Sequence, residues 1–169
     1  MAFVFDSAPN SVTANSYISV SDADDILAGR LSTENWDNLS TTDKEALLVQ
    51  ATNRLDAERY AGLKGIRGQS LQWPRQLVTD RDSYVYNNDE FPRELLIALC
   101  EQAMYFVDAG DRTISNDLLE DVIEYKVGPI QWKLKGGRQA DQLPQLVQQY
   151  LKAIGSAWFG KSFPSQSYR

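Results

Sequence analysis

The residues best suited to chemistry or recognition lie in the stretch Gln69–Arg75, which reads Gln-Ser-Leu-Gln-Trp-Pro-Arg. Trp73 and Arg75 are of the residue types that dominate protein interfaces, and the same side chains stack on nucleic-acid bases and bind phosphates. The segment 59–79 around them carries four basic residues and no acidic residue. A protein contact and a nucleic-acid contact therefore both stay open. A third interpretation is structural, with Trp73 closing the core and Arg75 paired to a carboxylate.

A glycine-rich segment just before this stretch invites comparison with phosphate-binding loops. Residues Gly62–Gly68 hold three glycines together with Lys64 and Arg67. Glycines let backbone amides approach a phosphate, and basic side chains supply charge. The segment lacks the Gly-Lys-Ser/Thr ending of a nucleotide-binding loop, and it follows a predicted helix rather than a strand. We therefore interpret it as an irregular loop.

The sequence offers no arrangement of residues for catalysis or metal binding. It contains no histidine, which excludes Ser-His and Cys-His nucleophiles and the most common transition-metal ligand. Cys100, its single cysteine, lies in an apolar helical stretch and is expected to be a small buried side chain. Asp22, Asp24 and Asp25 lack the spacing, glycine and closing glutamate of a calcium loop, so we interpret them as charges at a helix start. We expect no enzymatic activity, no cofactor and no metal.

Charge is segregated along the chain, which has a net charge of −6. The segments 1–58 and 80–124 carry net charges of −7 and −9, whereas 59–79 and 125–169 carry +4 and +6. Such blocks can cancel within one folded chain. They also suit head-to-tail self-association, because a heterologous contact in a ring presses one surface of a subunit against a different surface of its neighbour. Both interpretations stay open.

The length and the apolar pattern predict a single, mainly helical domain over residues 1–160, followed by a tail at 161–169. Residues 17–20 have the character of a short strand, and Ser21 is the expected N-cap of a first helix that ends near Gly29. The N-terminus has no basic start and few consecutive apolar residues. We therefore expect neither a signal peptide nor a membrane span.

A second helix is predicted from residues 40–43 to a point before Gly62, with Thr42 and Glu45 at capping-box spacing. From residue 60 to 91 the sequence has no helical period, and glycine, proline and asparagine mark turns instead. This predicts a long irregular loop. Loops of this length inside a compact domain tend to be binding elements, so we expect function here.

The remaining elements complete a small helical bundle. A helix over 92–110 is apolar on nearly every side and should be buried at the centre. Between 122 and 134 apolar and polar residues alternate, and Gly128-Pro129 interrupts them, which predicts either a β-hairpin or one bulged strand. A last helix is predicted over 143–160.

Candidate interface residues come from the basic loop, from the predicted strands and from the aromatic C-terminal end, because aromatic and arginine side chains anchor partners. They are Arg67, Gln69, Trp73, Arg75, Tyr125, Trp132, Trp158, Phe163 and Tyr168.

Several stretches resemble a phage protein family whose members are labelled DnaT-like single-stranded DNA-binding proteins. They are Ala14-Asn15-Ser16-Tyr17 leading into Ser21-Asp22-Ala23, the second helix ending in Leu55-Asp56, Gln69-x-Leu71-x-Trp73-Pro74-Arg75 with Pro92 before the next helix, and Lys126-Val127-Gly128-Pro129-Ile130. The resemblance covers most of the chain from Ala14 to Trp158, and the Gln-x-Leu-x-Trp-Pro-Arg stretch is its most specific part.

In size, helical content and late strand, such proteins are also similar to the head-tail connector adaptors of tailed phages. This similarity implies a virion protein without catalytic activity that forms a ring, expected to be dodecameric, beneath the portal. It implies the portal protein and a neck, stopper or tail protein as partners, double-stranded DNA passing through the channel, and assembly in the host cytoplasm without a membrane. The basic segment 125–169 with its aromatic tail is the candidate for the portal contact.

The family label implies a different function, namely single-stranded DNA binding as a replication accessory protein. Arg67, Trp73 and Arg75 in the basic segment then form the expected contact. The acidic net charge argues against this function, because binding to phosphates depends on basic groups. We expect the connector function and keep single-stranded DNA binding as the alternative.

Overall fold

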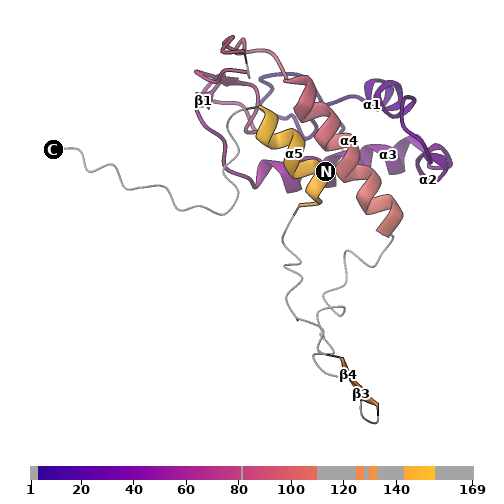
Figure 1. Ribbon diagram of the computed structural model, residues 1–169. Coiled ribbons are helices and arrows are strands. Elements are labelled where there is room, and N and C mark those ends of the chain that lie inside the picture. Colours follow the sequence, from indigo (N-terminus) through magenta and orange to yellow (C-terminus); the bar gives the residue numbers. More distant parts are fainter. Residues whose placement is uncertain (1–3, 81, 110–124, 128–129, 133–142, 155–169) are drawn as a thin grey trace.

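The helices of the chain pack around one central helix (Figure 1). The computed structural model describes residues 4–80, 82–109, 125–127, 130–132 and 143–154. Its helices are α1 (Val20–Leu27), α2 (Glu34–Asp37), α3 (Thr41–Asp56), α4 (Arg93–Ala109) and α5 (Gln145–Ala153). Its strands are β1 (Leu63–Lys64), β2 (Arg75–Gln76), β3 (Tyr125–Val127) and β4 (Ile130–Trp132). The predicted mainly helical fold with a small β element is confirmed.

Helix α4 is central because apolar residues cover most of its circumference. It packs against α1, α2, α3 and α5. Leu95, Leu99 and Met104 are fully buried in these contacts. The carbonyl of Pro92 accepts hydrogen bonds from the N–H groups of Leu95 and Leu96, so the helix starts directly after the proline. Both the buried position and the proline start agree with the sequence.

The strand predicted at residues 17–20 is wrong, because this segment leads directly into α1. Ser19 is the N-cap, and its Oγ accepts the backbone N–H of Asp22 at 3.1 Å. The N-cap therefore lies two residues before the predicted cap, Ser21. The adjacent side chains 17 and 18 are both buried, whereas a half-buried strand alternates between buried and exposed positions.

Helix α3 confirms the predicted second helix, although its cap differs. Ser40 is the N-cap, and its Oγ accepts the N–H of Asp43 at 3.2 Å, so the expected pair Thr42 and Glu45 does not start the helix. The predicted apolar face is buried, with Leu48, Ala51 and Leu55 as its fully buried members.

Helix α2 was not predicted from the sequence. Its buried residue is Trp36. The indole Nε1 donates to Asp24 at 2.7 Å, and Lys44 Nζ donates to the same carboxylate at 2.9 Å. Burial raises the pKa of Asp24, but the hydrogen bonds from Lys44 and Trp36 outweigh it and leave that pKa below its ordinary value. Asp24 thus joins α1, α2 and α3. Within the described ranges no cluster of three or more potential metal ligands occurs.

The segment between α3 and α4 is the long irregular loop that the sequence predicted. Its regular structure consists of the short antiparallel pair β1 and β2, with Leu63 opposite Gln76 and Lys64 opposite Arg75. A single antiparallel bridge joins Thr79 and Val85.

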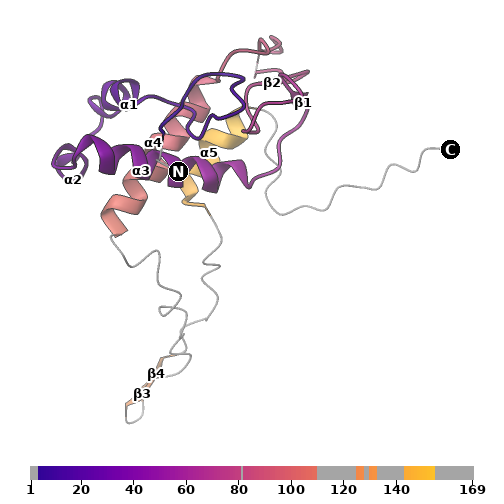
Figure 2. The same cartoon turned by 180° about the vertical axis from the view of Figure 1, so that it is seen from behind.

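The β element between α4 and α5 is a hairpin, which decides between the two alternatives left open by the sequence. Strands β3 and β4 pair antiparallel, with Tyr125 opposite Trp132 and Val127 opposite Ile130. Both views draw the hairpin apart from the helical body (Figures 1 and 2).

Helix α5 begins after Pro144 and packs against α4. Leu143, Val147 and Leu151 are buried at this contact, as the predicted apolar stripe requires. The predicted end of the helix at Gly160 lies outside the described residues. Within the part of the chain that the structure describes, no helix is long and apolar enough to cross a membrane.

Candidate functional site

Gln69 is buried inside the loop, and its side chain joins parts of the loop by hydrogen bonds. Its side-chain Nε2 donates to the carbonyls of Leu71 at 2.9 Å and Pro74 at 3.0 Å. Its Oε1 accepts the N–H of Ile66 at 2.9 Å. The amide is buried and satisfied at both ends, so it fixes the turn that precedes Trp73.

Arg75 binds backbone on both sides of the loop. Its Nε donates to the carbonyl of Ala61 and its Nη2 to that of Gly62, at 2.5 and 2.9 Å. Its Nη1 donates to the backbone and side-chain oxygens of Gln72 at 3.0 and 3.1 Å. Only 7% of Arg75 is exposed. The hydrogen-bond partners of the guanidinium are thus carbonyl oxygens, not the carboxylate that one interpretation of the sequence expected.

Trp73 is the aromatic centre of the loop and belongs to the hydrophobic core. It is 1% exposed and makes edge-to-face contacts with Tyr60 and Tyr86, each with ring centroids 5.9 Å apart. Such aromatic pairs stabilise a fold beyond the area that they bury. Within the described residues the Trp73 Nε1 has no hydrogen-bond partner.

Asp56 at the end of α3 connects three parts of the chain. Its Oδ1 accepts hydrogen bonds from the hydroxyl of Tyr17 and from the backbone N–H of Gln72. Burial, and then the charge of Asp56, raises the pKa of Tyr17 well above its ordinary value. Tyr60 donates to the carbonyl of Leu55, and burial raises its pKa in the same direction. The resemblance included Leu55-Asp56 but assigned no role to this carboxylate.

The glycine-rich segment packs against backbone atoms of the same loop. Gly62 has a φ of 72°, and a Cβ there would lie 2.3 Å from the carbonyl oxygen of Gln76. A Cβ on Gly65 would lie 2.3 Å from the carbonyl oxygen of Asn88. Lys64 Nζ donates to loop carbonyls. These contacts support the interpretation of an irregular loop, because the glycines permit close backbone approach within the chain.

The same loop exposes large apolar side chains. These apolar loop residues are Leu63, Ile66, Leu77, Tyr84 and Val85. Leu77 is 72% exposed and has a φ of 62°, a left-handed conformation that is sterically unfavourable for a leucine. Contiguous exposed apolar patches are a common feature of protein contact surfaces.

The charges on the exterior of the loop are mixed. Arg67 is exposed, but Asp82, Asp89 and Glu90 are exposed as well. Acidic and basic side chains are thus both exposed on the described part of this loop, whereas grooves that bind single-stranded nucleic acid are positively charged.

The other candidate residues lie elsewhere. Tyr125 and Trp132 are paired positions of the β3–β4 hairpin. Trp158, Phe163 and Tyr168 lie outside the described residues. None of the nine candidates is tested as an interface residue, so this role stays a prediction for all of them. What the structure adds is that Gln69, Trp73 and Arg75 lie inside the loop, whereas Arg67 lies on its outside.

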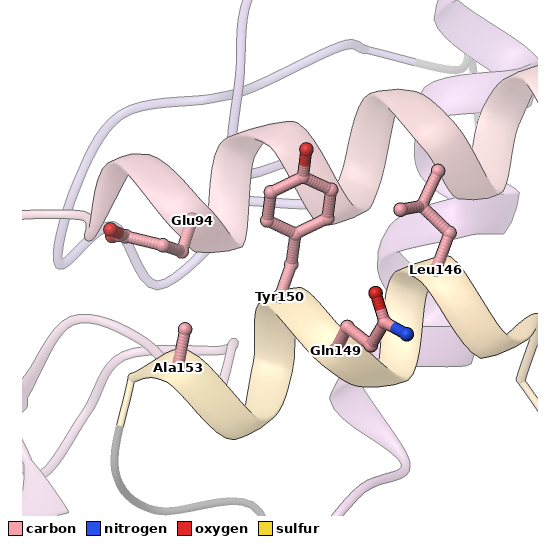
Figure 3. A pocket seen from close by; sticks show the side chains of 5 residues that line it. All are labelled: Glu94, Leu146, Gln149, Tyr150 and Ala153. Carbon is pink, nitrogen blue, oxygen red and sulfur yellow. The ribbon is translucent and has the colours of Figure 1, made fainter.

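Two hollows of about 300 and 380 Å³ lie on the described surface between α4 and α5, and Figure 3 shows the side chains that line the first. Cys100 is buried away from both, and burial raises the pKa of its thiol to about 12. A thiol in that state is a packing group, as the sequence predicted.

Comparison with known proteins gives one family. A family model described as "Putative DnaT-like ssDNA binding protein" matches residues 1–163. No curated protein and no solved structure matches the chain.

The Arg75 contacts generate a stability prediction. Arg75→Lys should lower the free energy of unfolding by about 2–4 kcal/mol, because an ammonium group cannot bind carbonyls on both sides of the loop at once. The matched control Arg67→Lys, at an exposed position, should change it by less than about 0.5 kcal/mol. Urea denaturation measures both. Equal stabilities for the two variants would contradict the role assigned to Arg75.

The buried tyrosines generate a prediction for alkaline pH. Tyr17 and Tyr60 stay protonated in the folded chain, because their pKa values lie above the ordinary value of 10. Their contribution to stability is complete below pH 10 and is lost as the pH rises further, at up to about 1.4 kcal/mol per pH unit for each group.

Urea denaturation between pH 9 and 11 measures this loss. Tyr60→Phe should reduce the slope of unfolding free energy against pH, whereas Tyr84→Phe, at an exposed tyrosine, should leave it unchanged. A slope that is the same in the wild type and in Tyr60→Phe is the contrary result.

Proposed function

The chain belongs to the family of DnaT-like single-stranded DNA-binding proteins, and on that premise we propose that it is a structural subunit of a phage head-tail connector. In this proposal identical copies associate head to tail in a ring between the portal and the neck or tail, around the channel for double-stranded DNA. The proposal assigns no catalytic activity to the chain. It places the subunit in the virion after assembly in the host cytoplasm.

The observation that carries the proposal is the outward display of the apolar loop residues. The interior of the loop is held by buried hydrogen bonds and aromatic contacts, so its exterior has a defined shape before any partner binds. Leu77 supports this most strongly, because it is both exposed and held in a left-handed conformation. Neither property benefits an isolated chain.

Charge segregation supports a contact between unlike surfaces. The segment 59–79 has a net charge of +4, whereas the segments on either side of it are strongly negative. A head-to-tail contact can match such surfaces, and closure of the ring satisfies every copy. The net negative charge also suits a channel wall along which DNA slides without binding.

Single-stranded DNA binding is the second candidate, and the description of the family favours it. Arg67 is exposed on the loop and is available for a phosphate. Trp73 and Arg75 are less suited to this role, because stacking on a base or clamping a phosphate would require them to leave their buried positions.

The assembly proposal predicts the behaviour of a variant at Leu77. Leu77→Asn should weaken self-association by at least about tenfold, because asparagine removes the apolar contact. The same change should preserve or slightly raise the melting temperature, because asparagine tolerates the left-handed conformation better than leucine. Sedimentation velocity of the full chain over a range of concentrations measures the association.

Leu31→Asn is the matched control, since Leu31 is an exposed leucine between α1 and α2, outside the loop. It should assemble like the wild type. Two results would contradict the proposal. One is a wild type that stays monomeric at every concentration, and the other is a Leu77→Asn variant that assembles normally.

Anisotropy of a labelled oligo(dT) at low salt separates the two candidate functions. The connector proposal predicts no saturable binding to the full chain. Binding that falls steeply with salt and is lost in Arg67→Glu would favour the alternative, because counterion release makes phosphate contacts salt-dependent.

A further inference from the structure

A groove between α4 and α5 lies outside the loop and has no role in the connector proposal. The two hollows of about 300 and 380 Å³ share Leu146, which is 45% exposed. Figure 3 shows Leu146 and Tyr150 projecting from α5 towards α4, with Glu94 at one end of the hollow. Tyr105 of α4 lines the second hollow and is half exposed. The groove is therefore a partly apolar depression open to solvent.

Acidic side chains follow the α4 wall of this groove. Glu94, Glu101 and Asp108 are spaced seven residues apart, which places them on one face of the helix. Glu101 is paired with Arg30 at 3.2 Å. Among the described residues, Glu94 has neither an ion pair nor a hydrogen bond to its side chain. Since Arg30 and Asn35 contact Glu101 and Asp108, an occupant of the groove should combine aromatic or aliphatic side chains with a positive charge near Glu94.

The chain's own segment 155–169 has this composition. It reads Gly-Ser-Ala-Trp-Phe-Gly-Lys-Ser-Phe-Pro-Ser-Gln-Ser-Tyr-Arg, with four aromatic residues, two basic residues and no acidic residue. It also starts at the correct place. Ala153, at the end of α5, lines the first hollow, and the segment begins two residues later in the sequence.

The distances permit the segment to fold back over the groove. Along α5 the groove extends from Ala153 to Leu146, which corresponds to about 10 Å of helix. A segment of 15 residues can span up to about 50 Å when extended. Attachment to α5 also raises its local concentration at the groove to about the millimolar range, which favours the segment over an unattached competitor.

We propose that segment 155–169 docks into the α4–α5 groove of its own chain. Its aromatic side chains fill the hollows on either side of Leu146, and Lys161 faces the row of acids that begins at Glu94. This inference concerns a different surface from the apolar loop residues and does not depend on ring formation.

Hydrogen–deuterium exchange of the full chain, followed by mass spectrometry, tests the proposal. The amides of residues 161–169 should exchange at least about tenfold more slowly than in a synthetic peptide of residues 155–169. Residues beyond Gly160 are the correct reporters, because an extension of α5 up to Gly160 cannot protect them. The protection should be independent of protein concentration.

Two variants should release the segment. Leu146→Asp puts a charge in the groove, and Lys161→Glu places an acid against the acids of α4; each should restore the exchange rates of the free peptide. Lys161→Glu changes no residue of the helical body, so its effect cannot arise from unfolding. The control Leu63→Asp changes an exposed leucine of the loop and should leave the protection intact.

Each alternative result overturns the proposal. Peptide-like exchange of residues 161–169 in the wild type would mean that the segment does not dock. Protection that grows with protein concentration would assign the groove to the segment of a second copy. Protection that survives both Leu146→Asp and Lys161→Glu would place the segment on another surface. None of these outcomes affects the Leu77→Asn test, so the two proposals can fail separately.

Discussion

The long segment between α3 and α4 has little regular structure, so its backbone carbonyls need partners other than a helix or a wide sheet. The guanidinium of Arg75 supplies several of these partners from one buried position. A buried charge is costly unless every donor is used, and here the donors point at carbonyl oxygens on both sides of the loop. Gln69 and Trp73 complete the arrangement, one by bonding the turn and the other by packing against two tyrosines. The rest of the loop depends on this interior.

Because Gln69 and Arg75 find their hydrogen-bond partners within the chain, the exterior of the loop is available for a partner. We infer that the motif which first suggested a contact fixes the shape of the loop, and that Leu77 and the other apolar loop residues form the contact surface that we propose. Asp56 extends the same network to α3 and to the N-terminal segment. A residue that looks like an interface residue by type can therefore be a scaffold for interface residues that composition does not single out.

The elements with strong apolar periodicity were predictable from the sequence, and those that depend on tertiary contacts were not. The central helix and the irregular loop follow from local patterns, as does the buried Cys100. The strand predicted at 17–20 failed because a serine cap two residues earlier than expected started α1. Helix α2 was missed because four residues are too few to show an apolar periodicity. Burial of Trp36 against the other helices stabilises this helix instead. The sequence could not distinguish a hairpin from one bulged strand at β3 and β4, because alternation of apolar and polar residues does not specify which residues pair. Exposure of Leu77 depends on a backbone conformation that leucine rarely adopts.

We propose that this member of the DnaT-like family is an assembly subunit rather than a DNA-binding protein. Electron micrographs of the purified full-length chain, alone and mixed with the portal protein of the same phage, test it most directly. The account predicts annular particles of uniform diameter, formed by the chain itself or on the portal. Particles no larger than a single chain in both samples would contradict it.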